Sequence, residues 1–378
     1  MTNPKSSENI LMVAASEYDA NLYYATRFLV PDPVVFMQVR GKKHLLMNDL
    51  ELDRARAQAK VDRVHSISKL AAEYKEAHGK RPSYLDLIET LAKKEKASEF
   101  VVPGNFPLEF ADPLRKRGLK IEVRPDPFFE KRTVKSKEEV AAVRKTIRYT
   151  EAAIQAAIDV LRKSVPRKGK LYYHGNVLKS EDIKRVINVK LMEDNCVAEN
   201  SIVACGIQCV DPHHRGTGPL YANESIIMDI FPRDAESRYH ADITRTVVRG
   251  KAKPKLKKMF QAVLDGQKIG FKNIRAGLDA STVHIAIEKL FQERGFQTGV
   301  MGGRMQGFFH GTGHGLGLDV HEAPRVGRVK DILKAGQIVT VEPGLYYEDA
   351  GGIRIEDDVL VTKTGCVVLS TLERRLEV

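Results

Sequence analysis

Four carboxylates lie within or at the end of apolar, strand-like segments, and they constrain the fold of this chain more than any other feature. Asp229 follows the apolar run of "ESIIMDIF", and Asp242 precedes the β-branched run of "ADITRTVV". Glu342 ends "QIVTVEPG", and Glu356 lies in "GGIRIEDDVLV". A carboxylate among apolar side chains is costly unless it is protonated, paired with a cation or bound to a metal ion. The fold must therefore bring each of the four to a partner.

Each of these carboxylates also has an ordinary structural explanation when it is taken alone. Asp229 could meet an arginine, Glu342 could cap a turn, and Glu356 could pair with Arg354, because charged residues in strands commonly have such partners. Four separate explanations would then have to hold at once. A single shared site accounts for all four carboxylates and is the interpretation that the sequence favours.

Asp229 and Asp242 are expected on successive antiparallel strands joined by the polar turn "RDAESR". Residues directly opposite each other in a hairpin point to the same face. We therefore predict that the two carboxylates are opposed and emerge side by side. Asp234 is a competing candidate, but its polar neighbours place it in the turn.

Residues 311–324, "GTGHGLGLDVHEAP", place His314 and His321 seven positions apart among glycines. Glycine weakens helices and strands, so this segment indicates either close backbone approach to a ligand or a tight bend with two hydrogen-bonded imidazoles. Carboxylates and imidazoles together suit divalent Mn, Co, Zn or Fe. Two divalent ions would balance four negative charges, and two-metal sites with ions ~3.5 Å apart activate a hydroxide for hydrolysis.

The chain has 378 residues, and about two domains are expected for this length. Strand-like and helical segments alternate in residues 1–132, which predicts an α/β domain. A proline- and charge-rich segment, "RPDPFFEKRTVKSKEEV", marks the boundary, and Ser136 and Glu139 form a capping-box pair that begins a helix.

Residues 133–378 are predicted to be α+β. Their helices are expected at 136–163, 180–193, 255–275 and 280–294, and their last two strands, "GQIVTVEPG" and "GGIRIEDDVLVT", are expected to form a hairpin around "LYYEDA".

The formal net charge of +12 raises the question of nucleic-acid binding. Lysine and arginine are spread along the chain among acidic residues, and the densest run, "KAKPKLKKMF", resembles the solvated start of an amphipathic helix. We expect no nucleic-acid partner.

Four cysteines are expected as small buried side chains, because no second pair completes a zinc site around Cys205 and Cys209. No apolar run approaches the ~20 residues of a membrane span, and the short apolar segment at residues 10–15 is flanked by Glu8 and Glu17, so a cytoplasmic protein without a signal peptide is expected.

The motifs of this chain resemble those of a known family, the Xaa-Pro peptidases of the aminopeptidase P and prolidase group. The resemblance is carried by "MDIFPRDAESRYHADITRT", "FFHGTGHGLGLDVHEAP", "VTVEPGLYY" and "GGIRIEDDVLVT", in that order, with "DPHHRGTGPL" upstream. It implies a "pita-bread" catalytic domain at 133–378, preceded by a creatinase-type α/β amino-terminal domain at 1–132.

The resemblance implies five metal ligands for two divalent ions, with Mn²⁺ expected and Co²⁺, Zn²⁺ or Fe²⁺ as alternatives. Asp229 would bind one ion and His314 the other, and Glu342 would bind the same ion as His314. Asp242 and Glu356 would bridge the two ions.

Further roles follow from the same resemblance. His321 would contact the substrate carbonyl or the tetrahedral intermediate, and His310 would line the pocket on the leaving side. His213, rather than His214, would move a proton or stabilise an oxyanion. Tyr346 and Arg354 would bind the substrate and brace the site, Arg354 by pairing with a ligand carboxylate or with the substrate. The hairpin between Asp229 and Asp242 is about two residues longer than is common in the family, which leaves the facing of its strands unchanged.

The expected activity is metal-dependent hydrolysis of the Xaa-Pro bond at the amino terminus of peptides, with Glu342 also transferring a proton. A prolidase acting on Xaa-Pro dipeptides is the alternative. A methionine aminopeptidase shares the ligands but typically lacks the large amino-terminal domain, and a binding protein or creatinase-like relative is disfavoured because all five ligand positions are filled. The family also implies a homodimer and a peptide substrate with proline at its second position.

Overall fold

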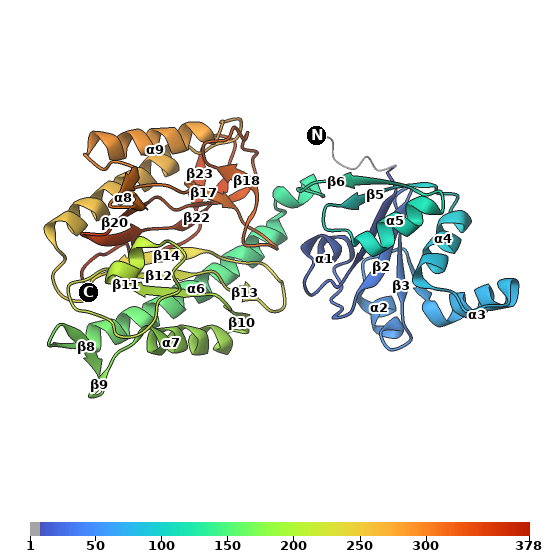
Figure 1. Ribbon diagram of the computed structural model, residues 1–378, viewed down its shortest axis with the longest axis horizontal. Coiled ribbons are helices and arrows are strands. Elements are labelled where there is room, and N and C mark those ends of the chain that lie inside the picture. Colours follow the sequence, from blue (N-terminus) through green and yellow to red (C-terminus); the bar gives the residue numbers. More distant parts are fainter. Residues whose placement is uncertain (1–7) are drawn as a thin grey trace. The chain divides into compact units, whose positions relative to one another are not determined.

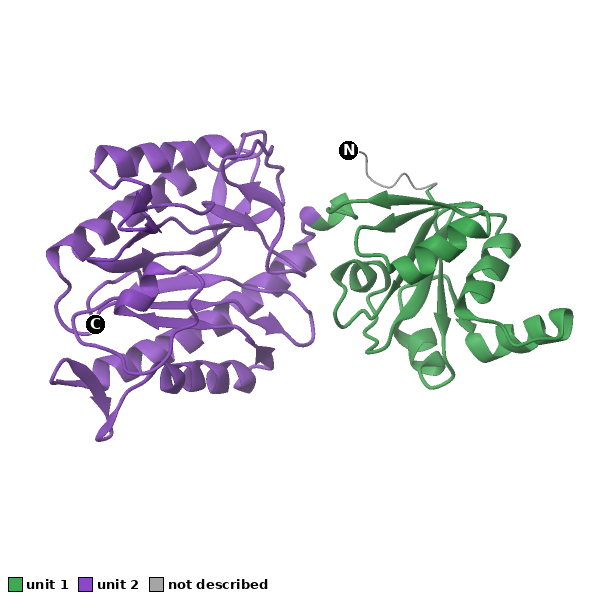
Figure 2. Ribbon diagram, viewed as in Figure 1, with its two compact units in different colours: residues 1–132 green, residues 133–378 purple. Residues whose placement is uncertain are grey.

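The computed structural model describes residues 8–378, and the chain divides into two compact units, Met1–Arg132 and Thr133–Val378 (Figure 2). Within the described residues, no helix combines the length and the apolar character needed to cross a membrane.

The first unit is a six-stranded mixed sheet with the strand order β4-β3-β2-β1-β5-β6 (Figure 1). β1 pairs antiparallel with β2 and parallel with β5. Its strands are β1 (Ile10–Ala14), β2 (Val34–Val39), β3 (Lys42–Met47), β4 (Arg63–Ser66), β5 (Glu99–Pro103) and β6 (Lys120–Arg124). Its helices are α1 (Ala20–Thr26), α2 (Leu52–Gln58), α3 (Ile67–His78), α4 (Tyr84–Lys94) and α5 (Leu108–Lys116).

Both faces of this sheet are buried. Leu11 and Val13 of β1 pack into one core with α4 residues such as Leu91, whereas Ile10 and Met12 face a second core with Leu22 of α1. Successive side chains of a strand point to opposite faces, so the continuous apolar run of β1 is explained by helices covering both sides.

The second unit begins with α6 (Lys137–Lys163), preceded by the 3-10 turn η1 (Glu130–Thr133). Ser136 and Glu139 form the predicted capping box, and an apolar stripe that includes Val143, Ile154 and Leu161 is buried. The other helices also lie close to their predicted ranges: α7 (Ser180–Glu193), α8 (Pro254–Asn273) and α9 (Ser281–Glu293). These positions could be predicted because capping residues and apolar spacing are local signals.

Two antiparallel sheets form the body of this unit. The smaller has the order β11-β12-β14 and the larger β18-β17-β19-β22-β23. α6 and α7 lie on the side of the smaller sheet, and α8 and α9 on the side of the larger one (Figure 1). The strands are β11 (Ile202–Cys205), β12 (Ile226–Ile230), β14 (Ile243–Val247), β17 (Gly313–Gly315), β18 (Glu322–Val326), β19 (Ile338–Val341), β22 (Asp357–Val361) and β23 (Cys366–Val368).

Shorter strand pairs complete the unit. They are the three-stranded β7 (Val165–Arg167), β8 (Lys170–Tyr173) and β9 (Asn176–Val177), the pair β10 (Cys196–Val197) and β13 (Arg233–Asp234), the hairpin β15 (Gly299–Met301) and β16 (Arg304–Gln306), and the hairpin β20 (Gly344–Tyr347) and β21 (Gly351–Arg354). A 3-10 turn, η2 (Gly206–Val210), follows β11.

The two sheets meet along β14. The Glu356 N–H donates to the Thr244 carbonyl at 3.1 Å, and the Thr246 hydroxyl donates to the Arg354 carbonyl at 2.8 Å. Asp229, Asp242 and Glu356 therefore lie along one seam, where the end of β21 passes beside β14.

The predicted hairpin at 336–362 is correct in its pairing but wrong in its turn. β19 pairs with β22, and Val341 lies opposite Asp357. "GLYY", however, forms β20, which pairs with β21 and confines the turn to residues 348–350. Leu345 and Tyr347 pack into the core, and Gly351 supplies the positive φ (98°) that ends the turn. The predicted strand "GGIRIEDDVLVT" is accordingly split into β21 and β22.

Candidate functional site

A cavity of about 1080 Å³ opens in the second unit, and its lining contains nearly all the residues singled out from the sequence. This size is at or slightly above the usual range of ligand pockets. The predicted residues that line it are Asp229, Asp242, His314, Glu342, Glu356, His213, His310, His321 and Arg354.

Asp229 and Asp242 reach this cavity from the smaller sheet, but they are not directly opposed as predicted. Asp229 lies opposite Thr244, and Asp242 lies two residues before Thr244. Residues two apart in an extended chain share a face, so both carboxylates still line the cavity. The prediction of direct opposition is wrong because the register pairs Ile230 with Ile243, which leaves Asp242 just outside the paired residues.

Asp234 lies in β13 rather than in a free turn. It accepts a hydrogen bond from the Ser237 N–H at 2.6 Å, and its other oxygen lies 3.4 Å from Lys145 Nζ. Asp234 does not line the cavity.

His314 lies in β17 and is 5% exposed. Its Nδ1 lies 3.2 Å from the Gly315 carbonyl, which can only accept a hydrogen bond, so Nδ1 carries the proton. Nε2 is then left with its lone pair toward Asp242 Oδ2 at 3.8 Å and Glu342 Oε1 at 3.5 Å. Burial, with His321 adding to it, lowers the pKa of His314 to about 3, so the ring is neutral and able to bind a metal ion.

Asp242, His314 and Glu356 each offer a ligand atom, and these three atoms lie within 4.8 Å of one another. All three residues are buried. Glu342 follows β19, and its Oε1 lies 3.5 Å from His314 Nε2. Asp229 lines the same cavity. The smaller sheet thus contributes Asp229 and Asp242 to the cavity wall, and the larger sheet contributes His314 and Glu342. Glu356 comes from the seam between the two sheets.

The donor set fits a divalent cation. Asp229 Oδ1 and Asp242 Oδ1 are buried and have no hydrogen-bond partner within residues 8–378. Burial, followed by the charges of neighbouring carboxylates, raises the pKa of both Asp242 and Glu356 well above the ordinary values, and burial raises the pKa of Glu342 to about 8. Carboxylates held this close require protons or a cation, and oxygen with imidazole ligands suits a divalent transition metal.

A second group of residues lies behind the carboxylates. Arg354 Nη2 donates to Asp229 Oδ2 at 2.6 Å, and Nη1 donates to the Tyr346 hydroxyl at 3.0 Å. His310 Nδ1 lies 2.7 Å from the Gly311 carbonyl, so Nδ1 is the donor and Nε2 accepts from the Tyr346 hydroxyl at 2.8 Å. Burial, then the charge of Arg354, lowers the pKa of His310 to about 3. Hydrogen bonds therefore run from Arg354 through Tyr346 to a neutral His310.

Tyr346 itself is fully buried and does not line the cavity. The expectation of a direct substrate contact for Tyr346 is therefore not supported by its placement, whereas the bracing contacts to Arg354 and His310 are present. Arg354 pairs with Asp229 and not with Glu356, the partner considered in the sequence.

The remaining histidines differ in position. His213 lines the cavity, whereas His214 does not and accepts the Gly216 N–H at 2.9 Å. The His321 ring packs edge-on against His314, with 4.3 Å between ring centroids. Phe308 and Phe309 contribute an aromatic wall beside His310.

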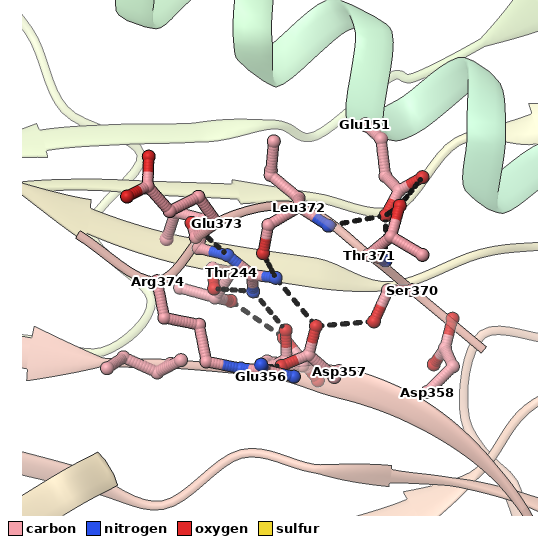
Figure 3. A network of polar contacts seen from close by, with 12 residues as sticks. Glu151, Thr244, Glu356, Asp357, Asp358, Ser370, Thr371, Leu372, Glu373 and Arg374 are labelled. Atoms are coloured by element: carbon pink, nitrogen blue, oxygen red, sulfur yellow. Dashed lines mark hydrogen bonds and ion pairs between the residues drawn. The ribbon is translucent and has the colours of Figure 1, made fainter. Parts of the chain in front are cut away.

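Sequence reasoning missed the polar network behind Glu356, which is centred on Asp357 (Figure 3). Asp357 accepts hydrogen bonds from Arg245 Nη2 at 2.7 Å and Arg374 Nε at 2.8 Å, as well as from Ser370 and Gln267. The Thr244 hydroxyl donates to Glu356 Oε2 at 2.7 Å, and Arg245 Nη1 donates to the Glu356 carbonyl at 2.7 Å.

Asp358, whose side chain was also missed, accepts the Asp242 N–H at 3.1 Å. The signal for Asp357 and Asp358 was the run of three carboxylates, "EDD", before an apolar strand. Asp357 and Asp358 fix the chain segments that carry Glu356 and Asp242.

Comparison with known proteins places this geometry in a family. The family model for metallopeptidase family M24 matches residues 141–363. An Xaa-Pro dipeptidase of Pyrococcus horikoshii is 28% identical over 279 residues, covering 73% of this chain and 74% of that protein.

Solved structures agree on the fold. The prolidase from Pyrococcus furiosus superposes with a TM-score of 0.78 at 21% identity, and 98% of each chain is covered. The X-Pro aminopeptidase from Thermotoga maritima superposes with a TM-score of 0.81 at 22% identity, again with 98% of each chain covered. The predicted pita-bread fold behind an amino-terminal α/β domain is thereby confirmed, and so is the resemblance seen in the motifs: the chain belongs to metallopeptidase family M24.

Proposed function

We propose that this protein hydrolyses the Xaa-Pro bond of short peptides and that the dipeptide is its preferred substrate. The observation that carries the proposal is the buried cluster of Asp242, His314 and Glu356, flanked by Asp229 and Glu342, at the wall of a large cavity. The name of the Pyrococcus horikoshii relative, Xaa-Pro dipeptidase, favours dipeptides over the aminopeptidase P activity expected from the sequence.

The five donors would hold two divalent ions, with Mn²⁺ as the expected metal. Asp229 would bind one ion, His314 and Glu342 the other, and Asp242 and Glu356 both. When bound, such ions lower the pKa of a water molecule and polarise the scissile carbonyl.

The chain's own residues would perform the remaining tasks. Glu342 would accept a proton from the attacking water and return it to the departing nitrogen, because a carboxylate beside the water can act first as a base and then as an acid. His321 would donate a hydrogen bond to the oxygen that gains charge. His213, which also lines the cavity, would act as a second proton donor, and Asp229 would meet the free amino group of the substrate.

The proline ring would lie against Phe308, Phe309 and His310. Proline has no backbone N–H and a fixed ring, so an apolar aromatic wall suits it better than a row of backbone hydrogen-bond partners. The neutral state of His310 keeps this wall free of charge. Arg325 and Lys330 add positive charge to the cavity lining, whereas Arg328 is paired with Glu288 at 2.6 Å. The charge of Arg325 and Lys330 suits a substrate with a free carboxylate and therefore supports dipeptides.

The decisive experiment compares metal-free and Mn²⁺-loaded protein on Ala-Pro and on Ala-Pro-Ala, with Asp242→Ala as the control. We expect metal-dependent cleavage of Ala-Pro that is lost in the variant. Preferred release of alanine from the tripeptide would instead indicate an aminopeptidase P. Failure to cleave either peptide by protein shown to bind metal would refute the proposal. A homodimer and a cytoplasmic location also remain predictions, and light scattering of the purified protein tests the first of them.

A further inference from the structure

Lys135 and Glu322 form an ion pair buried beside the cavity, with side chains only 1% and 7% exposed. Lys135 lies in the segment before α6, and Glu322 begins β18 immediately after His321. Lys135 Nζ also donates to the Thr133 carbonyl at 3.2 Å, and the Lys135 N–H donates to the Gly336 carbonyl at 2.8 Å. The lysine is therefore fixed at its backbone and at its ammonium group.

Glu322 is confined from the other side. Its backbone is paired with Gly315 in the register of β17 and β18, and a Cβ atom at Gly317 would lie 2.8 Å from Glu322 Oε1. Gly317 thus allows the backbone to approach the carboxylate closely. The segment 316–321 forms a loop that is closed at its base by the Gly315–Glu322 pair.

His321 is the last residue of this loop, and its exposed ring lies against His314. The start of the loop is held by backbone bonds from Leu316 to Ile338 at 3.1 Å and from His240 to Gly317 at 2.9 Å. At the end of the loop, the ion pair to Lys135 holds the side chain next to His321. The direction of the His321 ring therefore depends on how firmly Glu322 is fixed.

A buried ion pair is weak evidence for stability, because replacing both charges with neutral groups is often harmless to folding. We propose that Lys135 is a positioning residue: by holding Glu322 it keeps His321 aimed into the cavity beside His314. This inference rests on the proposed function of the site, and it assigns a task in the reaction to a residue that does not line the cavity.

The test compares Lys135→Met with Lys145→Met in the full-length protein. Lys145 pairs with Asp234, which is 1% exposed but lies outside the cavity, so both variants strip a lysine from a buried carboxylate. We expect Lys135→Met to lower kcat for Ala-Pro by about 10–100-fold, the range for residues that orient groups at a metal site. KM and Mn²⁺ affinity should stay within about twofold in the same variant. Lys145→Met should leave all three quantities unchanged.

A second readout does not depend on activity. The imidazole signals of metal-free protein carrying ¹³C-labelled histidine are recorded by NMR, and the His321 signal is assigned by its loss in His321→Gln. We expect Lys135→Met to shift the His321 signal and Lys145→Met to leave it in place. This signal decides on the positioning role even if the wild-type protein cleaves no Xaa-Pro peptide, so a failure of the proposed function remains distinguishable.

The double variant Lys135→Met with Glu322→Gln serves if Lys135→Met does not fold, because it removes both charges of the ion pair. We expect it to fold and still show a lowered kcat and a displaced His321 signal. Wild-type kcat together with a wild-type His321 signal, in either the single or the double variant, would overturn the inference.

Discussion

Arg354 and Asp229 form a buried ion pair in which Nη2 lies 2.6 Å from Oδ2, while the other oxygen, Oδ1, has no hydrogen-bond partner within residues 8–378. The guanidinium therefore neutralises one side of the carboxylate and leaves the other side for a cation. Asp229 thus uses Oδ2 for its ion pair with Arg354, whereas Oδ1 can bind a metal ion.

Removing Arg354 should destabilise the metal-free protein strongly. We expect Arg354→Met to lower the free energy of unfolding by about 3–5 kcal/mol, because Asp229 then keeps a buried charge without its partner. Urea unfolding measures this loss, and saturating Mn²⁺ should restore part of it. Arg162→Met, which breaks the exposed pair with Asp159, should change the stability by less than about 1 kcal/mol. Equal losses in the two variants would contradict the prediction.

The hydroxyl of Tyr346 should matter for activity although it does not line the cavity. Tyr346→Phe removes the acceptor for Arg354 and the donor to His310, and we expect a stability loss of about 1–3 kcal/mol. We also expect a rise in KM for Ala-Pro, because His310 loses its fixed direction on the leaving side. The matched control is Tyr347→Phe, which loses a hydrogen bond to the Gln297 carbonyl. An unchanged KM in Tyr346→Phe would show that His310 does not need this bond.

Asp242 should be essential for holding metal. Asp242→Asn keeps the shape of the side chain but removes its charge, and we expect at least a roughly 10-fold loss of Mn²⁺ affinity by calorimetry. Asp234→Asn changes an equally buried carboxylate that lies outside the cavity, so its Mn²⁺ affinity should match that of the wild type. The proposed ligand set would be wrong if the two variants bound Mn²⁺ alike.

Histidines with lowered pKa values, such as His310 and His314, stabilise the folded state increasingly as the pH rises to about 6.5. The contribution of Glu342 has the opposite sign, and it should make the stability of the metal-free protein fall as the pH rises from about 6.5 to about 8. Burial raises the pKa of Glu342 from the ordinary 4.5 to about 8, so in this window the folded chain holds a proton that the unfolded chain has released. Stability falls with rising pH wherever the folded state binds more protons. Asp242 and Glu356, whose pKa values are also raised by burial, act in the same direction.

Thermal unfolding at a series of pH values, with and without Mn²⁺, measures this dependence. Glu342→Gln should flatten the curve of the metal-free protein, and Mn²⁺ should abolish the fall above neutral pH because it takes the place of the protons. A Tm that rises between about pH 6.5 and pH 8 in metal-free protein would contradict the assignment.

Much of the fold and the members of the cavity were predictable from the sequence. α6 and α7 lie within one residue of their predicted ends, because capping residues and apolar spacing act over a few neighbours. The convergence of Asp242 and Glu356 was predictable because a buried charge needs a partner whatever path the chain takes, whereas His314 was identified through the resemblance to the peptidase family.

Features that depend on contacts between distant segments were not predictable. The pairing of Asp229 with Thr244 depends on the register of two strands joined by a long connection, which no local pattern indicates. Arg245 reaches Asp357 across 112 positions of the chain, and its sequence neighbours predict only a β-branched strand. "GLYY" forms a strand because β21 lies beside it, although its aromatic residues and the following "EDA" are compatible with a turn.

The proposed donors belong to segments that enter the seam from both sheets: Asp229 and Asp242 from one, His314 and Glu342 from the other. A cation shared among them would oppose local unfolding, because the two sheets could not separate at this point without breaking bonds between the cation and its ligands. The half-life of the protein against a protease would then follow the free metal concentration of its surroundings. A low metal concentration would then lower the amount of the protein as well as its activity, and the rate of proteolysis of the chain would depend on the metal supply.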